Sequence, residues 1–254
     1  MRIHRFFIEQ TLPSQGRIVI ANDDLAHQWR NVLRFQVGHE VILFDNSGKE
    51  FRATIHSLTN REAEVEILDV VDRTNKNNPA GSGGDGSSKP SVYLYLSLAK
   101  RDSFEWTLEK GTELGVSGFV PVLSERSEKK TVRLDRSQDI VTEASEQSGR
   151  VTVPTVTDQV TLEEALAQVC AMPQAFSFAL DPRGSTLNMS ELQRDFADIH
   201  GNRLNMFIGP EGGFSPAEIA LFKTSRIPVF SIGEQVLRAE TAAIAAASIF
   251  LLSY

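Results

Sequence analysis

The stretch LNMFIGPEGGFSPAEI, from Leu204 to Ile219, joins an apolar run to the start of a helix through a glycine turn. The run LNMFIG is typical of a buried strand. Ser215 has the residue type of a helix N-cap, Pro216 then takes the first helical position, and Glu218 completes a capping box. Open α/β sheets bind ligands at the carboxyl ends of their strands. The stretch therefore predicts an α/β domain with a ligand site at this turn.

The same alternation of strand and helix recurs before and after this stretch. Strand-like apolar runs occupy residues 92–98, 119–123, 175–180, 204–209 and 228–233. Helices are predicted from Asp102 to Gly115, from Asp139 to Ser148, from Thr161, after Ser215 and from about Thr241. Asp102 with Glu105, and Thr161 with Glu164, have the spacing of capping boxes. Strands separated by helices pair in parallel, with helices on both faces of the sheet.

The N-terminal part of the chain has the pattern of a small β-barrel with one helix. Three runs alternate apolar and polar residues, as half-buried antiparallel strands do, and two shorter runs precede them. The five runs occupy residues 4–8, 16–21, 40–45, 51–58 and 63–71. The helix is predicted from about Asp24 to Arg34.

This predicted helix has two different sides at helical spacing. The side expected to face the core carries Leu25, Trp29, Val32 and Leu33. The other side is basic and carries His27, Arg30 and Arg34. Periodicity alone favours a solvated surface for the basic side, because charge on exposed helix faces is ordinary.

A change of composition divides the chain. Residues 74–90, TNKNNPAGSGGDGSSKP, include no apolar residue large enough to anchor a core, so they predict a flexible linker. We therefore expect a β-barrel domain over residues 1–73, a linker over 74–90 and an α/β domain over 91–254.

Composition limits the classes of function. A net charge of −7 and a pI near 5.3 give no support to nucleic-acid binding over the whole molecule, so any polyanion site must be a local basic patch. The single cysteine, Cys170, excludes an internal disulfide and suits a reducing compartment. No cluster has metal-ligand spacing, so no metal is expected. The N-terminus lacks an apolar signal core, and no apolar run reaches the roughly 18 residues that span a bilayer, which predicts a cytoplasmic protein without a membrane span.

The glycine turn does not have the composition of a phosphate-binding loop. No Lys-Ser or Lys-Thr pair follows the glycines, and no G-x-G-x-x-G follows the first strand of the domain. The Glu211 carboxylate would also repel an anionic ligand in a partly desolvated site. A ligand with hydroxyl, amine or cationic groups fits better. The alternative is a purely structural turn that needs a positive φ at Gly212 or Gly213.

A second loop has similar features. The strand Val229 to Ile232 ends at Gly233 and is followed by EQVLRAE and an alanine-rich helix. Thr241 could cap that helix or direct its hydroxyl into a site. The alanines fit a subunit contact or simple helix propensity. Arg238 and Glu240 could form only a surface ion pair, but two such loops together favour a pocket.

These segments, in order, resemble the RsmE family of the SPOUT methyltransferases. The resemblance rests on seven groups of residues: MRIHRFF, His27 with VLR at Val32 to Arg34, TELGV at Thr112 to Val116, SERS at Ser124 to Ser127, EASEQSGR at Glu143 to Arg150, GPEGGFSPAE, and VLRAETAA. The family methylates N3 of a uridine in 16S ribosomal RNA. The resemblance implies a PUA-like RNA-binding barrel, an α/β domain with a deep trefoil knot, S-adenosylmethionine as the cofactor, and a homodimer that acts on 16S rRNA within the small ribosomal subunit.

The resemblance also implies the residues of the cofactor site. They are Leu180, Gly209, Pro210, Glu211, Gly212, Ile232, Gly233, Leu237 and Thr241. Family members often carry a basic residue where this chain has Gln235, so the resemblance does not imply a substrate contact at this position. The linker is also longer than the family pattern.

Two residues are assigned to the chemistry. Uracil N3 carries a proton and is a poor nucleophile until that proton leaves. A cation near the base would stabilise the uracil anion, and a carboxylate could accept the proton. We assign the first role to Arg238 and the second to Glu240, with Glu211 as the alternative acceptor.

The expected RNA contacts are basic residues spread over the chain. They are Arg5, Arg30, Arg34, Lys100, Arg101, Arg126, Lys129 and Lys130, and the stretch around the last three also holds Arg133 and Arg136. Such contacts set affinity without reading sequence. The alternatives are the same chemistry on another RNA such as tRNA, or a non-catalytic RNA-binding protein with this fold. A nicotinamide-dependent oxidoreductase is disfavoured by the missing dinucleotide fingerprint.

Overall fold

The computed structural model describes residues 3–73, 90–98, 100–128, 131–186 and 203–252. Its contacts divide the chain into two compact units. The first comprises Met1–Asn78 with Ser145–Val153, and the second comprises Pro79–Ala144 with Pro154–Tyr254. The predicted linker over 74–90 lies outside the described residues except for Pro90.

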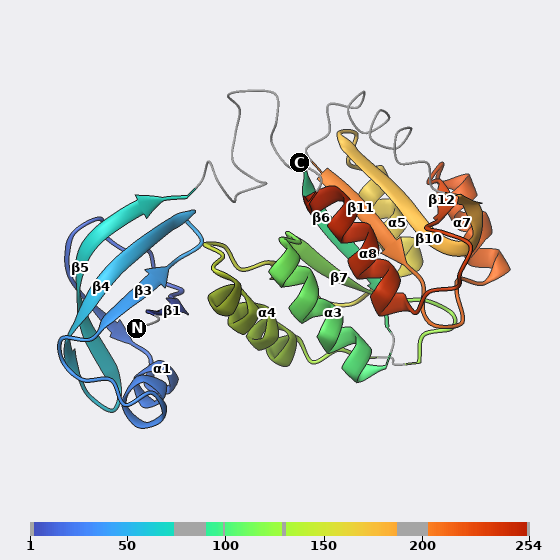
Figure 1. The fold of residues 1–254 in the computed structure, drawn as a ribbon. Helices are drawn as coiled ribbons and strands as arrows, with labels where there is room; N and C mark the ends of the chain where they lie inside the picture. The colour runs from blue at the N-terminus through green and yellow to red at the C-terminus, as the bar shows by residue number, and fades with distance from the viewer. Residues whose placement is uncertain (1–2, 74–89, 99, 129–130, 187–202, 253–254) are drawn as a thin grey trace. The chain divides into compact units, whose positions relative to one another are not determined.

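The first unit is built on a five-stranded sheet (Figure 1). Its strands are β1 (His4–Phe7), β2 (Gly16–Ala21), β3 (Glu40–Phe44), β4 (Lys49–Leu58) and β5 (Glu62–Asp72), in the order β1-β3-β4-β5-β2. The pairings among β3, β4, β5 and β2 are antiparallel, as the alternating pattern predicts. Strand β1 pairs with β3 in parallel, which the pattern does not reveal.

The helix of this unit changes from an α-helix to a π-helical turn halfway along. Helix α1 (Asp23–His27) is capped by Asn22, whose side chain accepts from Leu25 N at 3.0 Å. A π-helical turn, η1 (Gln28–Val32), follows. Because this turn is wider than an α-helical one, Trp29 is fully buried while Val32 is 66% exposed. The prediction that Val32 faces the core is therefore wrong, whereas His27, Arg30 and Arg34 are exposed as expected.

The first unit also includes a segment from far along the sequence. Phe7 N donates to Glu146 Oε1 at 2.9 Å, Arg5 Nη2 donates to the Arg150 carbonyl at 3.0 Å, and Val153 N donates to Asn46 Oδ1 at 2.7 Å. These bonds satisfy one backbone group of β1, the Phe7 N–H, and two of the distant segment, the Arg150 carbonyl and the Val153 N–H. The segment Ser145–Val153 thus completes the first unit, although its sequence gives no sign of belonging there.

The second unit is built on a seven-stranded sheet in which every described pairing is parallel. Its strands are β6 (Ser91–Ser97), β7 (Gly118–Leu123), β8 (Thr155–Val156), β9 (Val160–Thr161), β10 (Ala175–Thr186), β11 (Arg203–Ile208) and β12 (Val229–Ser231). Their order is β12-β10-β11-β6-β7-β8, with β9 also on β7. All five predicted strands are present. Strands β8 and β9 are too short to show a period.

Helices cover both faces of this sheet, as predicted (Figure 1). Helices α3 (Arg101–Leu114) and α8 (Ala239–Leu252) pack on each other, and α8 also packs on β6 and β11. Helices α5 (Leu162–Cys170) and α7 (Pro216–Thr224) pack on each other and on β7 and β12 respectively. Helix α4 (Leu134–Ser148) begins at Leu134 rather than at the predicted Asp139.

The predicted helix caps are confirmed at three places and wrong at one. Capping boxes are formed at Thr161 and Ser215, and Gly115 ends α3 in the left-handed conformation with φ 110°. The predicted box at Asp102 is absent, because the N-cap of α3 is Lys100, two residues earlier, and its side chain makes no capping bond. The Glu105 carboxylate instead accepts from Arg101 Nε at 2.6 Å.

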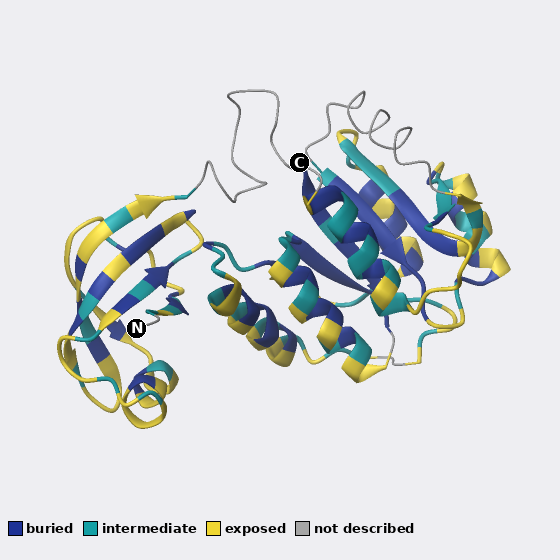
Figure 2. Cartoon of the chain, viewed as in Figure 1, coloured by how far each residue is buried: buried dark blue, intermediate teal, exposed yellow. Residues whose placement is uncertain are grey.

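Strand order brings the site together. The central strands are buried on both sides (Figure 2), which explains their continuous apolar runs. Strand β11 lies between β10 and β6, so Ile208 at its end is in register with Leu180 on one side and Leu96 on the other. The carboxyl ends of these strands therefore face one edge of the sheet.

Among the described residues, no helix is long and apolar enough to cross a membrane.

Candidate functional site

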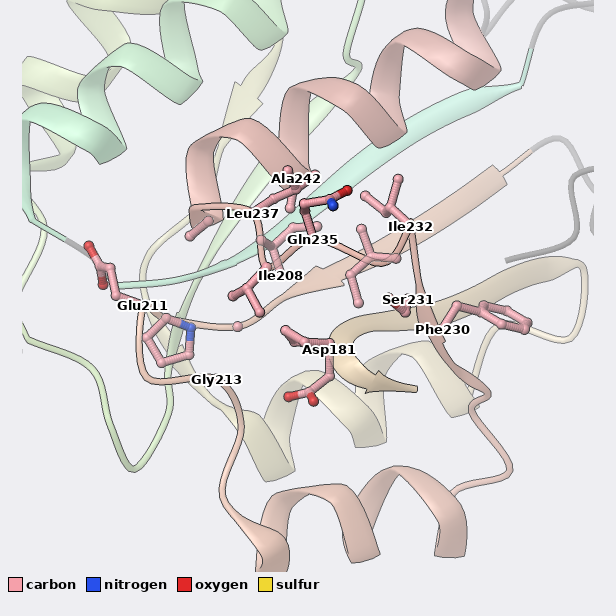
Figure 3. A pocket seen from close by; sticks show the side chains of 16 residues that line it. Asp181, Ile208, Glu211, Gly213, Phe230, Ser231, Ile232, Gln235, Leu237 and Ala242 are labelled. Atoms are coloured by element: carbon pink, nitrogen blue, oxygen red, sulfur yellow. The ribbon is translucent and has the colours of Figure 1, made fainter. Parts of the chain in front are cut away.

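A pocket lies at the carboxyl end of β11, beside the middle of β10 and the loop after β12 (Figure 3). Six residues predicted for the cofactor site line it: Leu180, Gly209, Pro210, Glu211, Ile232 and Leu237. Both predicted loops thus meet at one cavity. Gly212, Gly233 and Thr241 are not among the lining residues, so their role stays a prediction. The lining also includes Asp181, Gly213 and Gln235.

The glycine turn is held in a shape that side chains would disturb. Gly213 has φ 67°, and its N–H donates to the Pro210 carbonyl at 2.8 Å. A Cβ on Gly213 would lie 3.2 Å from Asp181 Oδ2, and one on Gly209 would lie 3.2 Å from the Phe214 ring. The expectation of a positive φ in this turn is confirmed for Gly213.

Asp181 holds this turn in place through hydrogen bonds. Its carboxylate accepts from the Arg183 backbone at 2.9 Å, from Arg183 Nε at 2.7 Å, from Arg183 Nη2 at 2.8 Å and from Phe214 N at 3.2 Å. These bonds use the acceptor capacity of both oxygens. Arg183 Nη2 also donates to the Phe214 carbonyl, so Asp181 and Arg183 together bind both backbone groups of Phe214.

The electrostatic state of Asp181 follows from the same contacts. Burial raises the pKa of the Asp181 carboxyl, but the hydrogen bonds and charge of Arg183 outweigh burial, so the pKa lies below its ordinary value. Sequence reasoning missed Asp181. The available signal was an aspartate directly after the apolar run of residues 175–180, at the edge where ligands bind.

A neighbouring loop, Ser124–Ser127, holds the turn from the other side. Arg126 Nη1 donates to the Gly212 carbonyl at 2.6 Å. Glu218 is buried and accepts from Glu125 N at 2.8 Å through Oε1 and from Ser215 N at 2.7 Å through Oε2. The capping carboxylate of α7 therefore also fixes the Ser124–Ser127 loop. Arg126, predicted as an RNA contact, is engaged with the cofactor turn.

The second loop is open to solvent. Ser231 Oγ donates to the Gly233 carbonyl at 2.8 Å, and the loop then carries Val236, which is 76% exposed. Arg238 is exposed, and no ion pair joins it to Glu240 in the described part of the chain. The ion-pair interpretation is therefore wrong. Glu211 lies at one end of the pocket, with its carboxylate directed away from Asp181 (Figure 3).

A small cavity next to the pocket contains two polar atoms without partners. Glu240 Oε2 and Ser97 Oγ are both buried, and neither has a hydrogen-bond partner among the described residues. Both residues line one cavity of about 10 Å³, room for about one water molecule. Ile208 and Ala239 line this cavity as well as the main pocket. A single water molecule in this cavity, or a group of a bound ligand, would give both atoms a hydrogen-bond partner.

The predicted RNA contacts lie in different settings. Arg5 pairs with the Glu50 carboxylate and only 14% of its side chain is exposed, so it is engaged within the first unit. Arg30 is exposed and donates to Asn60 Oδ1 at 2.7 Å. Arg34, Lys100 and Arg101 are exposed. Lys129 and Lys130 lie outside the described residues.

Known proteins match both units. The RNA methyltransferase domain family matches residues 87–251, and the RNA methyltransferase PUA domain family matches residues 30–68. The ribosomal RNA small subunit methyltransferase E of Synechocystis is 31% identical over 85% of this chain and 67% of its own, and that of Rickettsia conorii is 25% identical over 97% and 94%.

A solved structure shares the whole fold. The ribosomal RNA small subunit methyltransferase E of Neisseria gonorrhoeae, bound to S-adenosyl methionine, is 29% identical with a TM-score of 0.81 and covers 100% of this chain and 98% of its own. The resemblance inferred from the motifs is thus confirmed. The chain belongs to the ribosomal RNA small subunit methyltransferase E family of RNA methyltransferases.

Proposed function

We propose that this enzyme transfers a methyl group from S-adenosylmethionine to N3 of a uridine in 16S ribosomal RNA. The observation that carries the proposal is the charge of the pocket where the two predicted loops meet. Among the described lining residues none is Lys or Arg, Glu211 is acidic, and the charge of the Asp181 carboxylate is balanced by Arg183, which is not a lining residue. A cofactor with a sulfonium, an amine and hydroxyls but no phosphate suits such a lining.

The pocket residues would hold the cofactor in distinct ways. Leu180, Ile208 and Leu237 offer apolar surface to its base, and the backbone of Gly209 allows close approach. When bound, S-adenosylmethionine supplies an electrophilic methyl group. The role of the protein is to hold the attacking nitrogen in line with that methyl group and to prepare that nitrogen for attack.

Glu240 is the proton acceptor in this proposal. Its Oε2 atom is buried without a partner beside Ile208, which also lines the cofactor pocket. In this proposal the unpaired Glu240 carboxylate oxygen, beside the pocket assigned to the cofactor, accepts the uracil N3 proton. Glu211, the alternative acceptor, is exposed and directed away from Asp181 (Figure 3). Arg238 is exposed two residues before Glu240 and free to approach the uracil oxygens, where its charge would stabilise the anion.

We further propose that the enzyme works as a homodimer. Helix α8 has apolar residues on more than one side: Ala243, Ala247 and Phe250 are buried, whereas Leu252 is 65% exposed. On α3, which packs on α8, Trp106 is 42% exposed. Large exposed apolar side chains on two adjacent helices favour a contact with a second copy.

The remaining parts of the proposal follow the family. The barrel unit binds RNA, and the exposed Arg30 and Arg34 support that role. The substrate is 16S rRNA in the small ribosomal subunit, in the cytoplasm, and the free Cys170 suits that compartment. The trefoil knot implied by the family stays a prediction, because strand order alone does not determine how a chain threads.

One experiment tests the function. The protein and labelled S-adenosylmethionine are incubated with small ribosomal subunits that lack the modification, and separately with bulk tRNA, and the methylated base is mapped. We expect label only on N3 of a uridine of 16S rRNA. Label on tRNA would assign the chemistry to another RNA, and no label on either would remove the proposed activity.

A further inference from the structure

A second cavity of the methyltransferase unit is lined by arginines. It measures about 300 Å³ and lies where the end of β6 meets the first turns of α3 and α4. Its charged lining residues are Arg101, Arg133, Arg136 and Glu105. Three guanidinium groups against one carboxylate leave an excess of two positive charges, in a chain whose net charge is −7. The cavity, which we call the arginine cleft, shares no lining residue with the cofactor pocket.

The arginines of the cleft remain available to a ligand. Glu105 holds Arg101 at 2.6 Å and Arg136 at 3.5 Å, yet 56% and 46% of those side chains stay exposed. Arg133 reaches Asp135 only at 4.0 Å, with 76% of its side chain exposed. Glu105 therefore orients two guanidinium groups without covering them. Their forked donors match the oxygens of a phosphate.

The cleft also has an apolar side. Leu98, Phe104 and Val132 line it together with the arginines. An inorganic anion would gain nothing from these side chains, whereas a nucleotide could place its base against them and its phosphate on the guanidinium groups. The N-terminus of α3 adds backbone N–H groups, since Lys100 makes no side-chain capping bond there.

The cleft is connected to the catalytic region through shared residues. Phe104 lines both the cleft and the small cavity that contains Ser97 Oγ and Glu240 Oε2. Ile208 and Ala239 then line both the small cavity and the cofactor pocket. The small cavity with the proposed proton acceptor Glu240 thus lies between the cofactor pocket and the arginine cleft.

We propose that the arginine cleft binds the nucleotide adjacent to the target uridine, with its phosphodiester on Arg133 and Arg136. This inference rests on the proposed function, since it needs a target base at Glu240. A bound neighbour fixes the strand on one side of the target, so that the target base, taken out of its stack, reaches the cofactor. The cleft contributes affinity and register rather than the identity of the base.

The test replaces Arg133 and Arg136 together with glutamine, which removes charge but keeps hydrogen-bonding groups. Lys223→Gln is the control, because Lys223 is an exposed cation in the last turn of α7, outside the cleft. Methyl transfer to unmodified small subunits is measured as kcat and KM, cofactor affinity by calorimetry, and binding of single-stranded RNA at several salt concentrations.

We expect the double variant to raise KM for the subunits about tenfold or more, with the cofactor Kd unchanged. The slope of log affinity against log salt should become shallower by about 0.7 for every single-strand phosphate that the variant no longer binds. The charge-retaining variant Arg133→Lys with Arg136→Lys should restore the salt slope and part of the affinity, because lysine keeps the charge but not the forked donors.

A double variant that matches Lys223→Gln in KM and in salt slope would overturn the inference. In that case wild-type methylation of 16S rRNA would leave the proposed function intact. If wild-type protein methylates no RNA, the proposed function fails instead. If the double glutamine variant also loses cofactor affinity, its fold is disturbed and its KM does not report on the cleft. The lysine variant then tests the inference. A lysine variant that binds the cofactor but shows no activity would contradict phosphate binding in the cleft.

Discussion

The guanidinium group of Arg126 donates to the Gly212 carbonyl at 2.6 Å, so a side chain from the Ser124–Ser127 loop holds the glycine turn of the cofactor pocket. The Glu125 N–H to Glu218 Oε1 bond ties the same loop to the helix that follows the turn. The shape of the cofactor pocket thus depends on a loop that contributes none of its described lining residues.

Arg126→Ala should weaken cofactor binding. A hydrogen bond from a charged donor contributes about 1.5–3 kcal/mol, and we expect a loss of cofactor affinity of about tenfold or more, measured by calorimetry. Arg126→Lys should lose less. If alanine instead leaves cofactor affinity intact and makes the salt dependence of RNA binding shallower, Arg126 is an RNA contact, as the sequence predicts.

Asp181→Asn should destabilise the second unit by about 1–3 kcal/mol at neutral pH, since the amide cannot accept all four bonds. The folded pKa of Asp181 lies below its ordinary value of 3.8. Its ionisation therefore stabilises the fold above that value, and this stability is lost as pH falls through the folded pKa. Thermal unfolding of wild type and variant should converge in acid. A difference in Tm that stays constant with pH would contradict a stabilising role for the ionised Asp181 carboxylate.

Gly233→Ala tests the predicted cofactor role of Gly233 without straining the protein. An added Cβ there meets no atom within 4 Å, so a loss of cofactor affinity indicates that Gly233 touches the ligand itself. Gly213→Ala is the contrast. An alanine held at this positive φ should destabilise the protein by about 1–2 kcal/mol whether or not the cofactor is bound. Unchanged affinity in Gly233→Ala would remove Gly233 from the site.

Glu240→Gln should lower kcat by about 100-fold or more, the usual contribution of a general base. Cofactor affinity should change little, and the residual rate should rise with pH as hydroxide takes over removal of the N3 proton. Glu211→Gln serves as the comparison. Equal losses from both variants, or a larger loss from Glu211→Gln, would reassign the acceptor.

Arg238→Ala should reduce turnover far more than cofactor affinity, because its charge is needed only once the uracil is anionic. Rates under saturating cofactor and calorimetric Kd values give the two quantities. Similar losses in both would make Arg238 a cofactor contact instead.

Much of the fold follows from local patterns. Buried parallel strands leave continuous apolar runs, and the capping boxes at Thr161 and Ser215 mark helix starts through hydrogen bonds made within four residues. The cofactor loops are predictable for the same reason, since each follows a recognisable strand.

What the sequence does not reveal depends on contacts between distant segments. Asp181 acts through Phe214, and Arg126 through Gly212, and neither spacing is periodic. Asp102 and Glu105 have the spacing of a capping box, but the Glu105 carboxylate accepts a hydrogen bond from the Arg101 side chain instead. Periodicity misplaces Val32 because a π-helical turn breaks the 3.6-residue period on which the prediction relies.

The membership of Ser145–Val153 in the first unit has an evolutionary consequence. The chain passes from one unit to the other after residues 78, 144 and 153, so neither unit is a single continuous piece of sequence. A gene fusion or exchange that cut only at the linker would deliver a barrel without the partners of Phe7 and Asn46. Replacing the first unit intact would therefore require an exchange at all three crossing points of the chain.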